Sequence, residues 1–443
     1  MRLTWSRPED LLPHALVQAV AEGVGVEDVA QRWTAAGGPL EPEVSGASED
    51  AALAALRPLA AELLDEIDRR TAPAPDIPSS ASDDRTAGGR VDFQRVLGGW
   101  LGRAAGCLVG KPVEKIPREG IRAIAEATGN WPVRGYFTAE GLPAELAERW
   151  PWNRRSRPTS LVENIAGMPE DDDLNFAMLA LALLERHGTA LRTEDVAQAW
   201  LSDLPAGRVF TAERAAYRNL LDGVEPDRAA LVRNPFREWI GALIRADVHG
   251  WAHPGDPAAA ARSVYPDAWL SHRRNGLYGA LWAAAMSASA VVDDDVDAVL
   301  DAGLSVVPDD SALAAAVRHG RTLGCSGRPL DDALDELHTA YGGLHWVHSV
   351  NNAALIAYAL AASGGEFREA VGIAVMGGWD TDSAGATTGA ICGALAGSAA
   401  LPQEFVGPLD NRIASTLPGF DGIAIDELAR RTAALADRPR DTR

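Results

Sequence analysis

The sequence predicts an all-α protein, and three observations carry this prediction. Alanine is abundant, and runs of β-branched residues, which favour strands, are scarce. Apolar residues recur at helical spacing, as Leu53, Leu56, Leu59 and Leu63 do. No segment shows the convincing alternation of apolar and polar residues that a half-buried strand requires. We therefore expect a compact multi-helix domain preceded by an N-terminal helical extension.

The order of elements follows from the same spacing and from the chain breakers. Residues 8–70 read as a few helices, and residues 71–90 form a linker with three prolines, three serines and a Gly-Gly pair. This predicts a boundary near residue 90, with an extension and linker over 1–90 and the main domain over 91–443. Residues 111–168, rich in proline, are expected to be irregular. The helices expected in the main domain cover 92–110, 173–187, 194–204, 211–222, 236–248, 276–290, 309–321, 351–363, 366–376 and 382–400.

Composition and charge exclude several classes of protein. The formal net charge is −21, and the sequence shows no cluster of basic residues that could bind phosphates, so we expect no nucleic-acid binding. The only lysines are Lys111 and Lys115, which we attribute to genome composition. Three cysteines in 443 residues form no disulfide framework, which fits a cytoplasmic location. The uncharged stretch 383–402 is dominated by Ala, Gly, Ser and Thr, so we expect a buried helix there and no membrane segment.

Two of the expected helices carry a glycine at every fourth position. They are Gly98, Gly102, Gly106 and Gly110 in one helix, and Gly385, Gly389, Gly393 and Gly397 in the other. Residues four apart share a helix face, and each interior glycine costs about 0.5–1 kcal/mol relative to alanine. Close approach of two backbones would compensate for that cost. If the two faces pack antiparallel, Glu114 lies beside Asp380 and Asp382.

The first acidic cluster is Glu170, Asp171, Asp172 and Asp173, directly before an amphipathic helix. One or two acids at a helix N-terminus are explained by capping and by the helix dipole. Four in a row repel one another, and a hard cation with oxygen ligands would relieve that repulsion. Both interpretations stay open for this cluster alone.

The second acidic cluster is Asp380 and Asp382, followed by the hydroxyl of Ser383. It opens the second glycine-bearing helix. A capping Asp explains one of these acids, whereas two acids at alternate positions with a hydroxyl can ligate one cation. Carboxylates at the mouth of a buried helix are costly unless they are paired or bound to metal.

Several other polar residues are weaker candidates. His345, Trp346 and His348 precede a helix and could line a pocket for a planar base, although isolated histidines are more often structural. A zinc site would need further His or Cys partners, and none can be assembled. The segment that contains Arg273, Arg274 and Asn275 could meet a diphosphate. Gly377 and Gly378 complete the candidate substrate-binding set.

Taken together, these segments resemble the ADP-ribosylglycohydrolase family, which includes the dinitrogenase-reductase-activating glycohydrolases. Residues 102–114 resemble the family's first block, in which a small-residue helix ends in a Glu. Residues 170–173 resemble its Thr-Asp-Asp-Thr block, and residues 380–383 its Asp-x-Asp-Thr/Ser block. Cys107 stands where the family usually has Asp, and Glu170 and Asp173 stand where it usually has Thr. Trp379 is inserted between the glycine pair and Asp380.

The resemblance implies an all-helical fold with two Mg²⁺ ions between these blocks, with Ca²⁺ or Mn²⁺ as alternatives. It implies that Asp171, Asp172, Asp380 and Asp382 are metal ligands, that Glu170 replaces the Thr ligand, and that Ser383 takes the last ligand position. It also implies that Glu114 is a mobile acid near the scissile bond and that Asp171 and Asp382 take part in catalysis.

The resemblance implies a hydrolase that cleaves the glycosidic bond between ADP-ribose and an acceptor, for which we expect an arginine side chain. Metal-oriented water would attack the anomeric carbon. The expected partner is an ADP-ribosylated protein or a ribosylated small molecule. Two alternatives stay open: an N-glycosidase acting on another ribosylated small molecule or nucleoside, and a non-catalytic ADP-ribose-binding protein.

Overall fold

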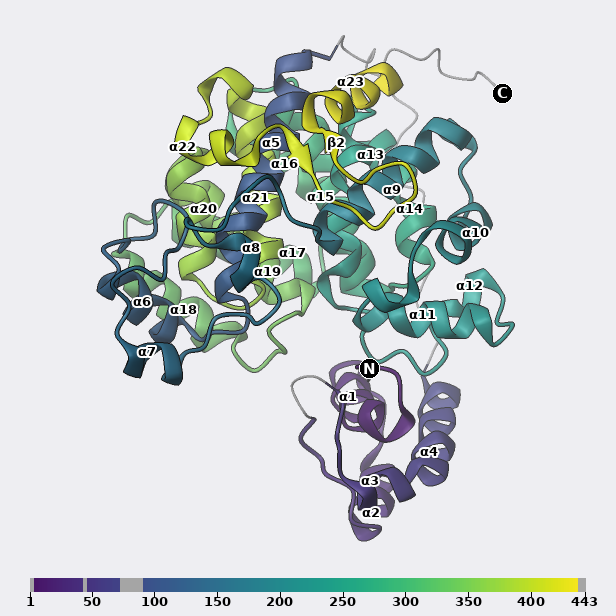
Figure 1. The fold of residues 1–443 in the computed structure, drawn as a ribbon. Helices are drawn as coiled ribbons and strands as arrows, with labels where there is room; N and C mark the ends of the chain where they lie inside the picture. Colours follow the sequence, from purple (N-terminus) through teal and green to yellow (C-terminus); the bar gives the residue numbers. More distant parts are fainter. Residues whose placement is uncertain (1–3, 43–45, 72–90, 437–443) are drawn as a thin grey trace. The chain divides into compact units, whose positions relative to one another are not determined.

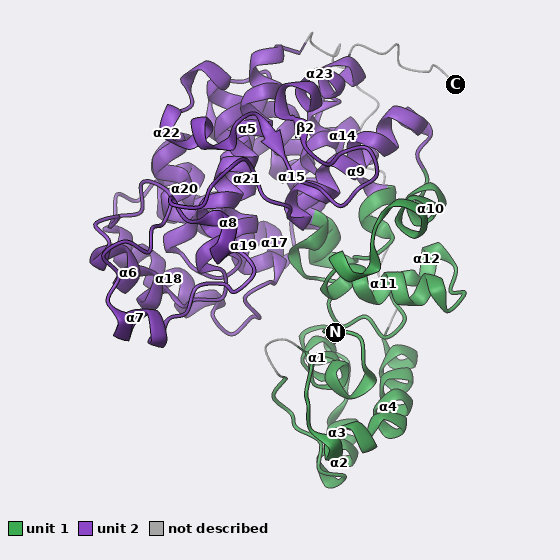
Figure 2. Ribbon diagram, in the orientation of Figure 1, with its two compact units in different colours: residues 1–78, 192–242, 266–277 green, residues 79–191, 243–265, 278–443 purple. Residues whose placement is uncertain are grey.

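The computed structural model describes residues 4–42, 46–71 and 91–436, and these residues are almost entirely helical. Two compact units divide the chain (Figure 2): unit 1 holds residues 1–78, 192–242 and 266–277, and unit 2 holds 79–191, 243–265 and 278–443. The predicted linker lies outside the described residues except for Thr71. The domain division at residue 90 stays a prediction.

Unit 1 combines the first helices of the chain with a later segment. Within it, Arg237 forms an ion pair with Glu22 at 2.8 Å, and the rings of Trp5 and Phe236 meet edge to face at 5.5 Å. These contacts join residues more than 200 positions apart. Its helices are α1 (Pro8–Ala21), α2 (Glu27–Ala35), α3 (Ala51–Ala55), α4 (Arg57–Arg70), α10 (Thr193–Asp203), η3 (Ala206–Arg208), α11 (Thr211–Leu221) and α12 (Pro226–Ala229).

Unit 2 is built around α5 (Phe93–Gly110) and α21 (Thr381–Ala396), which pack along their lengths (Figure 1). Helix α20 (Phe367–Met376) covers α21, and α23 (Ile425–Ala436) packs on α5. A second close pair is α17 (Ala312–Gly324) with α19 (Ser349–Ser363). The strands β1 (Arg412–Ile413) and β2 (Ile423–Ala424) form one short antiparallel pair in which Arg412 faces Ala424.

The remaining helices of unit 2 and three elements shared by both units complete the fold. In unit 2 they are η1 (Lys111–Val113), α6 (Arg118–Ala127), α7 (Ala144–Arg149), α8 (Arg157–Ser160), α9 (Asp172–His187), η2 (Gly188–Ala190), α13 (Asp247–Trp251), α16 (Val296–Leu304), α18 (Leu330–Tyr341), η5 (Ser398–Ala400), α22 (Gln403–Val406) and η6 (Gly407–Leu409). The shared elements are η4 (Ile240–Arg245), α14 (Pro257–Trp269) and α15 (Arg274–Ala290).

The all-α prediction is confirmed, with differences in detail. The helix predicted over 236–248 is wrong, since this segment forms η4 and the short α13. The Asn234 side chain accepts a hydrogen bond from the Phe236 amide at 3.2 Å, and Gly241 packs against the Glu213 carboxylate, which favours a tight turn. Residues 111–168, expected to be irregular, contain three short α-helices (α6, α7 and α8) and the 3₁₀-helix η1.

The uncharged stretch 383–402 is mostly the buried helix α21, as expected. No helix within the described ranges combines the length and apolar character needed to cross a membrane.

Candidate metal centre

The glycine faces of α5 and α21 pack against each other antiparallel. A Cβ atom built on Gly98, Gly102 or Gly106 would overlap the carbonyl oxygen of Gly393, Gly389 or Gly385, respectively. At the end of α5, the Thr381 hydroxyl donates a hydrogen bond to the carbonyl oxygen of Gly110 at 2.9 Å. The predicted close approach of the two backbones is confirmed, and it sets the register of the two helices.

This register brings together the acids that follow α5 and open α21. Glu114, Asp380 and Asp382 each offer a carboxylate oxygen, and these atoms lie within 4.8 Å of one another. The predicted proximity of Glu114 to the two aspartates is therefore confirmed. We call these three residues the Glu114 group. The Asn153 side-chain amide donates a hydrogen bond to the Glu114 carboxylate, and Lys115 Nζ lies 3.2 Å from its Oε1.

A strained turn holds Asp380 at the mouth of α21. Gly378 and Trp379 both have positive φ, at 74° and 63°, and the latter value is unusual for a residue with a side chain. The Trp379 ring stacks on His338 of α18 with centroids 4.2 Å apart, and His338 Nε2 donates a hydrogen bond to the Gly377 carbonyl at 2.8 Å. The insertion of Trp379 thus gives the turn a side-chain anchor on α18.

A second set of candidate ligands lies at the start of α9. Cys107 Sγ and carboxylate oxygens of Asp171 and Asp173 also lie within 4.8 Å of one another. We call these residues the Asp171 group. Asp171 caps α9, because its Oδ1 accepts a hydrogen bond from the Asp173 amide at 2.9 Å. The Ser383 hydroxyl donates a hydrogen bond to Asp173 Oδ2 at 3.4 Å.

Two cationic side chains enter the Asp171 group, and sequence reasoning missed both. The ammonium of Lys111, from η1, pairs with Asp171 Oδ2. The guanidinium of Arg103, from α5, lies 3.5 Å from Asp173 Oδ1 and 2.5 Å from Asp247 Oδ2. Nothing in the local sequence of Lys111 distinguishes it from a surface lysine.

Burial and mutual repulsion dominate the electrostatics of the site. Burial, followed by the charges of Asp382 and Glu114, raises the pKa of Asp380 well above its ordinary value. Burial and Glu114 raise the pKa of Asp382 to about 7. Burial and the neighbouring carboxylates also raise the pKa values of Asp172 and Asp173. Close carboxylates with raised pKa values are typical of sites that bind a cation.

The other predicted ligands lie beside these groups. The carboxylate of Glu170 accepts hydrogen bonds from Asn175 Nδ2 at 2.8 Å and from the Thr416 hydroxyl at 3.4 Å. Asp172 is the first residue of α9, between Asp171 and Asp173. Neither Glu170 nor Asp172 belongs to the Glu114 group or the Asp171 group. Their roles as ligands stay predictions.

The candidate substrate residues lie in different surroundings. Trp346 lies near the Glu114 group, since Lys115 Nζ is 5.2 Å from its ring centroid. His348 caps α19 through a hydrogen bond from the Val350 amide at 3.2 Å, and burial lowers its pKa to about 4. His345 Nδ1 lies 3.4 Å from the Val347 amide, which donates to it.

Asn275 belongs to unit 1, where its side-chain amide donates to Glu238 Oε2 at 2.6 Å. Arg273 is buried there and donates to the carbonyl oxygens of His272 and Asp227, each at 2.7 Å. Its guanidinium also lies 3.4 Å from the Trp269 ring centroid. These contacts describe a structural arginine, and Arg274 is the more exposed of the two arginines suggested for a diphosphate; that role stays a prediction.

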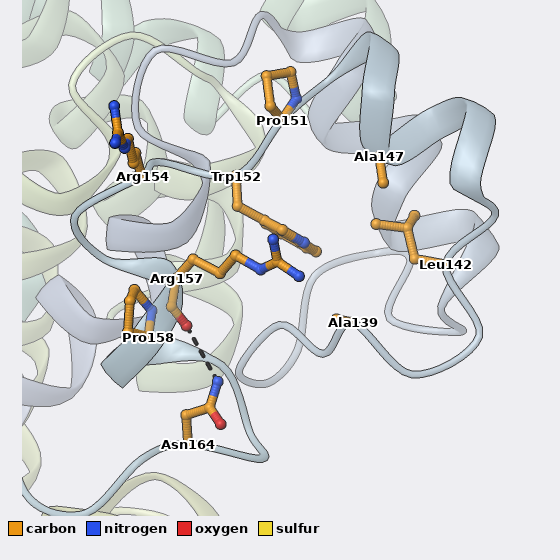
Figure 3. Close-up of a pocket in the computed structure, with 9 residues that line it drawn as sticks. All are labelled: Ala139, Leu142, Ala147, Pro151, Trp152, Arg154, Arg157, Pro158 and Asn164. Carbon is orange, nitrogen blue, oxygen red and sulfur yellow. Dashed lines mark hydrogen bonds between the residues drawn. The ribbon is translucent and has the colours of Figure 1, made fainter.

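A cavity of about 730 Å³ opens in the segment that carries Asn153. Figure 3 shows Trp152 and Arg157 facing Leu142 and Ala147 across it, with Arg154 at its edge. The Asn164 side-chain amide donates to the Arg157 carbonyl at 3.2 Å and holds one wall. Guanidinium groups beside an indole suit an anionic ligand with a planar ring.

A sequence model described as ADP-ribosylglycohydrolase matches residues 90–442. The chain belongs to the ADP-ribosylglycohydrolase family. A solved structure described as an "ADP-ribosylglycohydrolase-related protein complex" aligns with 22% sequence identity and a TM-score of 0.48, over 78% of this chain and 97% of that one. The comparison with curated proteins gave no match.

The ADP-ribosylglycohydrolase family consists of metal-dependent glycosidases. The match spans all three acidic blocks of the candidate site. In this family member, the acidic side chains of the Glu114 and Asp171 groups could hold metal.

Proposed function

We propose that this protein is a Mg²⁺-dependent hydrolase that releases ADP-ribose from an arginine side chain of a modified protein. One observation carries the proposal: the Glu114 group gathers three carboxylates from two distant segments within 4.8 Å. The family supports the reaction class. We infer in addition that the acceptor is arginine and that the ion is Mg²⁺.

The donor set of the Glu114 group fits a hard divalent cation. Its ligand atoms are all carboxylate oxygens, which Mg²⁺, Ca²⁺ and Mn²⁺ prefer. Asp380 and Asp382 are 5% and 8% exposed, so their repulsion is poorly screened by water. A cation between them would compensate this repulsion.

In this proposal a bound cation would hold the adjacent hydroxyls of the ribose and lower the pKa of a water. Asp380 and Asp382 would hold this cation, and Glu114 beside them accepts the proton of the water that attacks the anomeric carbon, as the general base. Asn153 orients the Glu114 carboxylate through its hydrogen bond. The remaining carboxylates stabilise the positive charge that develops on the sugar.

The cavity beside Asn153 supports a large anionic substrate. The backbone N–H of Asn153 donates a hydrogen bond to the Pro112 carbonyl at 2.9 Å, which ties the cavity wall to the segment that carries Glu114. Arg154 and Arg157 would meet the diphosphate, and Trp152 offers a ring for stacking.

We expect the metal-stripped protein to release no ADP-ribose from arginine-linked substrate and to regain activity with Mg²⁺. Free ADP-ribose measured by chromatography gives the result, with serine-linked and free-nucleotide substrates run in parallel. Release from another acceptor alone would replace arginine in the proposal. Failure to release ADP-ribose from any acceptor, with Mg²⁺ bound, would exclude the proposed function.

Replacing Glu114 with Gln should lower kcat by about 10²–10⁴-fold, the usual contribution of a general base. KM should change little, since the amide keeps the shape of the side chain and its place beside Asn153. The matched control is Glu119→Gln, the same change at an exposed residue of α6. A Glu114→Gln enzyme with the kcat of the wild type would exclude Glu114 as the base.

A further inference from the structure

We propose that the ammonium of Lys111 occupies one of two cation positions, so that the centre binds a single divalent ion, in the Glu114 group. This inference rests on the metal dependence in the proposed function. It departs from the two ions that the family resemblance implies, because the residues of the Asp171 group do not fit the second ion.

The side chain of Lys111 is buried among the acids of the site. Lys111 directly follows α5, and its side chain is 7% exposed. Its ammonium contacts Asp171 Oδ2 and lies 3.5 Å from the Glu170 carbonyl oxygen. Because Asp171 Oδ1 already caps α9, both carboxylate oxygens of Asp171 are engaged by donors of the protein itself. A metal ion at this position would have to displace the ammonium.

The Asp171 group has cationic side chains beside its carboxylates. Arg103, whose side chain is fully buried, lies beside Asp173 as Lys111 lies beside Asp171. Lys111, together with the part of the Arg103 charge that Asp247 does not take, therefore already offsets part of the negative charge of this group.

The Glu114 group differs in this respect. Within the described ranges, Asp380 and Asp382 form no ion pair with a lysine or arginine. Lys115, whose side chain is 49% exposed, contacts Glu114, and the charge of Lys111 also acts on Asp382. Because neither Asp380 nor Asp382 has a paired cation among the described residues, the group retains negative charge for a divalent ion.

The amino-acid composition provides an independent observation. Lys111 and Lys115 are the only lysines of the chain, and the other Lys/Arg positions are all arginine. Both lysines contact an acid of the proposed centre. A compact ammonium with three donors fits a position shaped for a small cation, whereas a planar guanidinium does not. We infer that position 111 requires a compact cation beside Asp171.

The experiment counts Mn²⁺ ions bound to the full-length protein. The wild type, Lys111→Met and Lys111→Gln are dialysed to equilibrium with Mn²⁺, the bound metal is measured by elemental analysis, and the Mn²⁺ spectrum is recorded by electron paramagnetic resonance. We expect one ion and the six-line spectrum of an isolated Mn²⁺ for the wild type. Both variants should bind two ions with the broadened spectrum of a coupled pair. Lys115→Met, the matched control, should still bind one ion.

Each outcome decides a separate point. Two coupled ions in the wild type would overturn the inference and leave the proposed function intact. One ion in the wild type and in each Lys111 variant that retains its circular dichroism spectrum would also overturn it. No bound Mn²⁺ in any protein would overturn the metal dependence on which the proposed function rests.

Discussion

Gly102→Ala should destabilise the protein by about 2 kcal/mol, the usual cost of overpacking a close contact. In most helix interiors the same substitution stabilises by about 0.5–1 kcal/mol, so the sign of the effect is reversed here. The reason is that the added methyl group would overlap the carbonyl oxygen of Gly389, a backbone atom that can move only if α21 moves. The free energy of unfolding is obtained from urea denaturation followed by circular dichroism.

The matched control is Gly343→Ala, in the connection between α18 and α19. A Cβ built on Gly343 has no heavy atom within 4 Å in the described structure, so stability should change by no more than about 0.5 kcal/mol. Gly102→Ala should also lower the activity of the folded enzyme, because the helix register places Glu114 beside Asp380. A Gly102→Ala protein as stable as the wild type would contradict the close packing of α5 and α21.

The glycine spacing is the part of the site that could be predicted from the sequence with physical reasoning alone. Residues four apart share a helix face, and two such faces with no side chains have one favourable use, which is contact with each other. Because the period is fixed, the contact could be extended by one turn from Gly110 to Glu114 and from Gly385 to Thr381. The proximity of Glu114 to Asp380 and Asp382 followed directly.

The partners that act through a single contact could not be predicted in this way. Lys111, Asn153 and His338 have no periodic neighbours, and each reaches the site from a segment whose path depends on the whole fold. The same limit explains the wrong helix over 236–248, where side-chain contacts of Asn234 and Glu213 override the apolar spacing. Periodic patterns report helix faces, whereas isolated polar contacts become visible only in three dimensions.

Asp380→Asn should lower turnover by about 10³-fold or more, since a lost cation ligand removes roughly 4 kcal/mol of transition-state stabilisation. The amide has nearly the same shape and should not disturb α21. The same substitution should also change the thermal stability of the protein, and the two effects together test the role of Asp380. In the metal-free protein, Asn at this position removes one of three closely spaced, repelling carboxylates, so the variant should have a higher Tm than the wild type.

Addition of Mg²⁺ should reverse this order. Ligand binding to the folded state stabilises it by mass action, so the Tm of the wild type should rise with Mg²⁺ while that of Asp380→Asn should stay nearly constant. The control is Asp310→Asn at an exposed position, for which both turnover and the Mg²⁺-dependent rise in Tm should match the wild type. A variant that lost turnover but kept the full Mg²⁺-dependent rise would show that Asp380 acts on the substrate and that the cation lies elsewhere. Only a coupled loss of both properties assigns Asp380 to the cation, because the repulsion that destabilises the metal-free protein is the same charge that binds the ion.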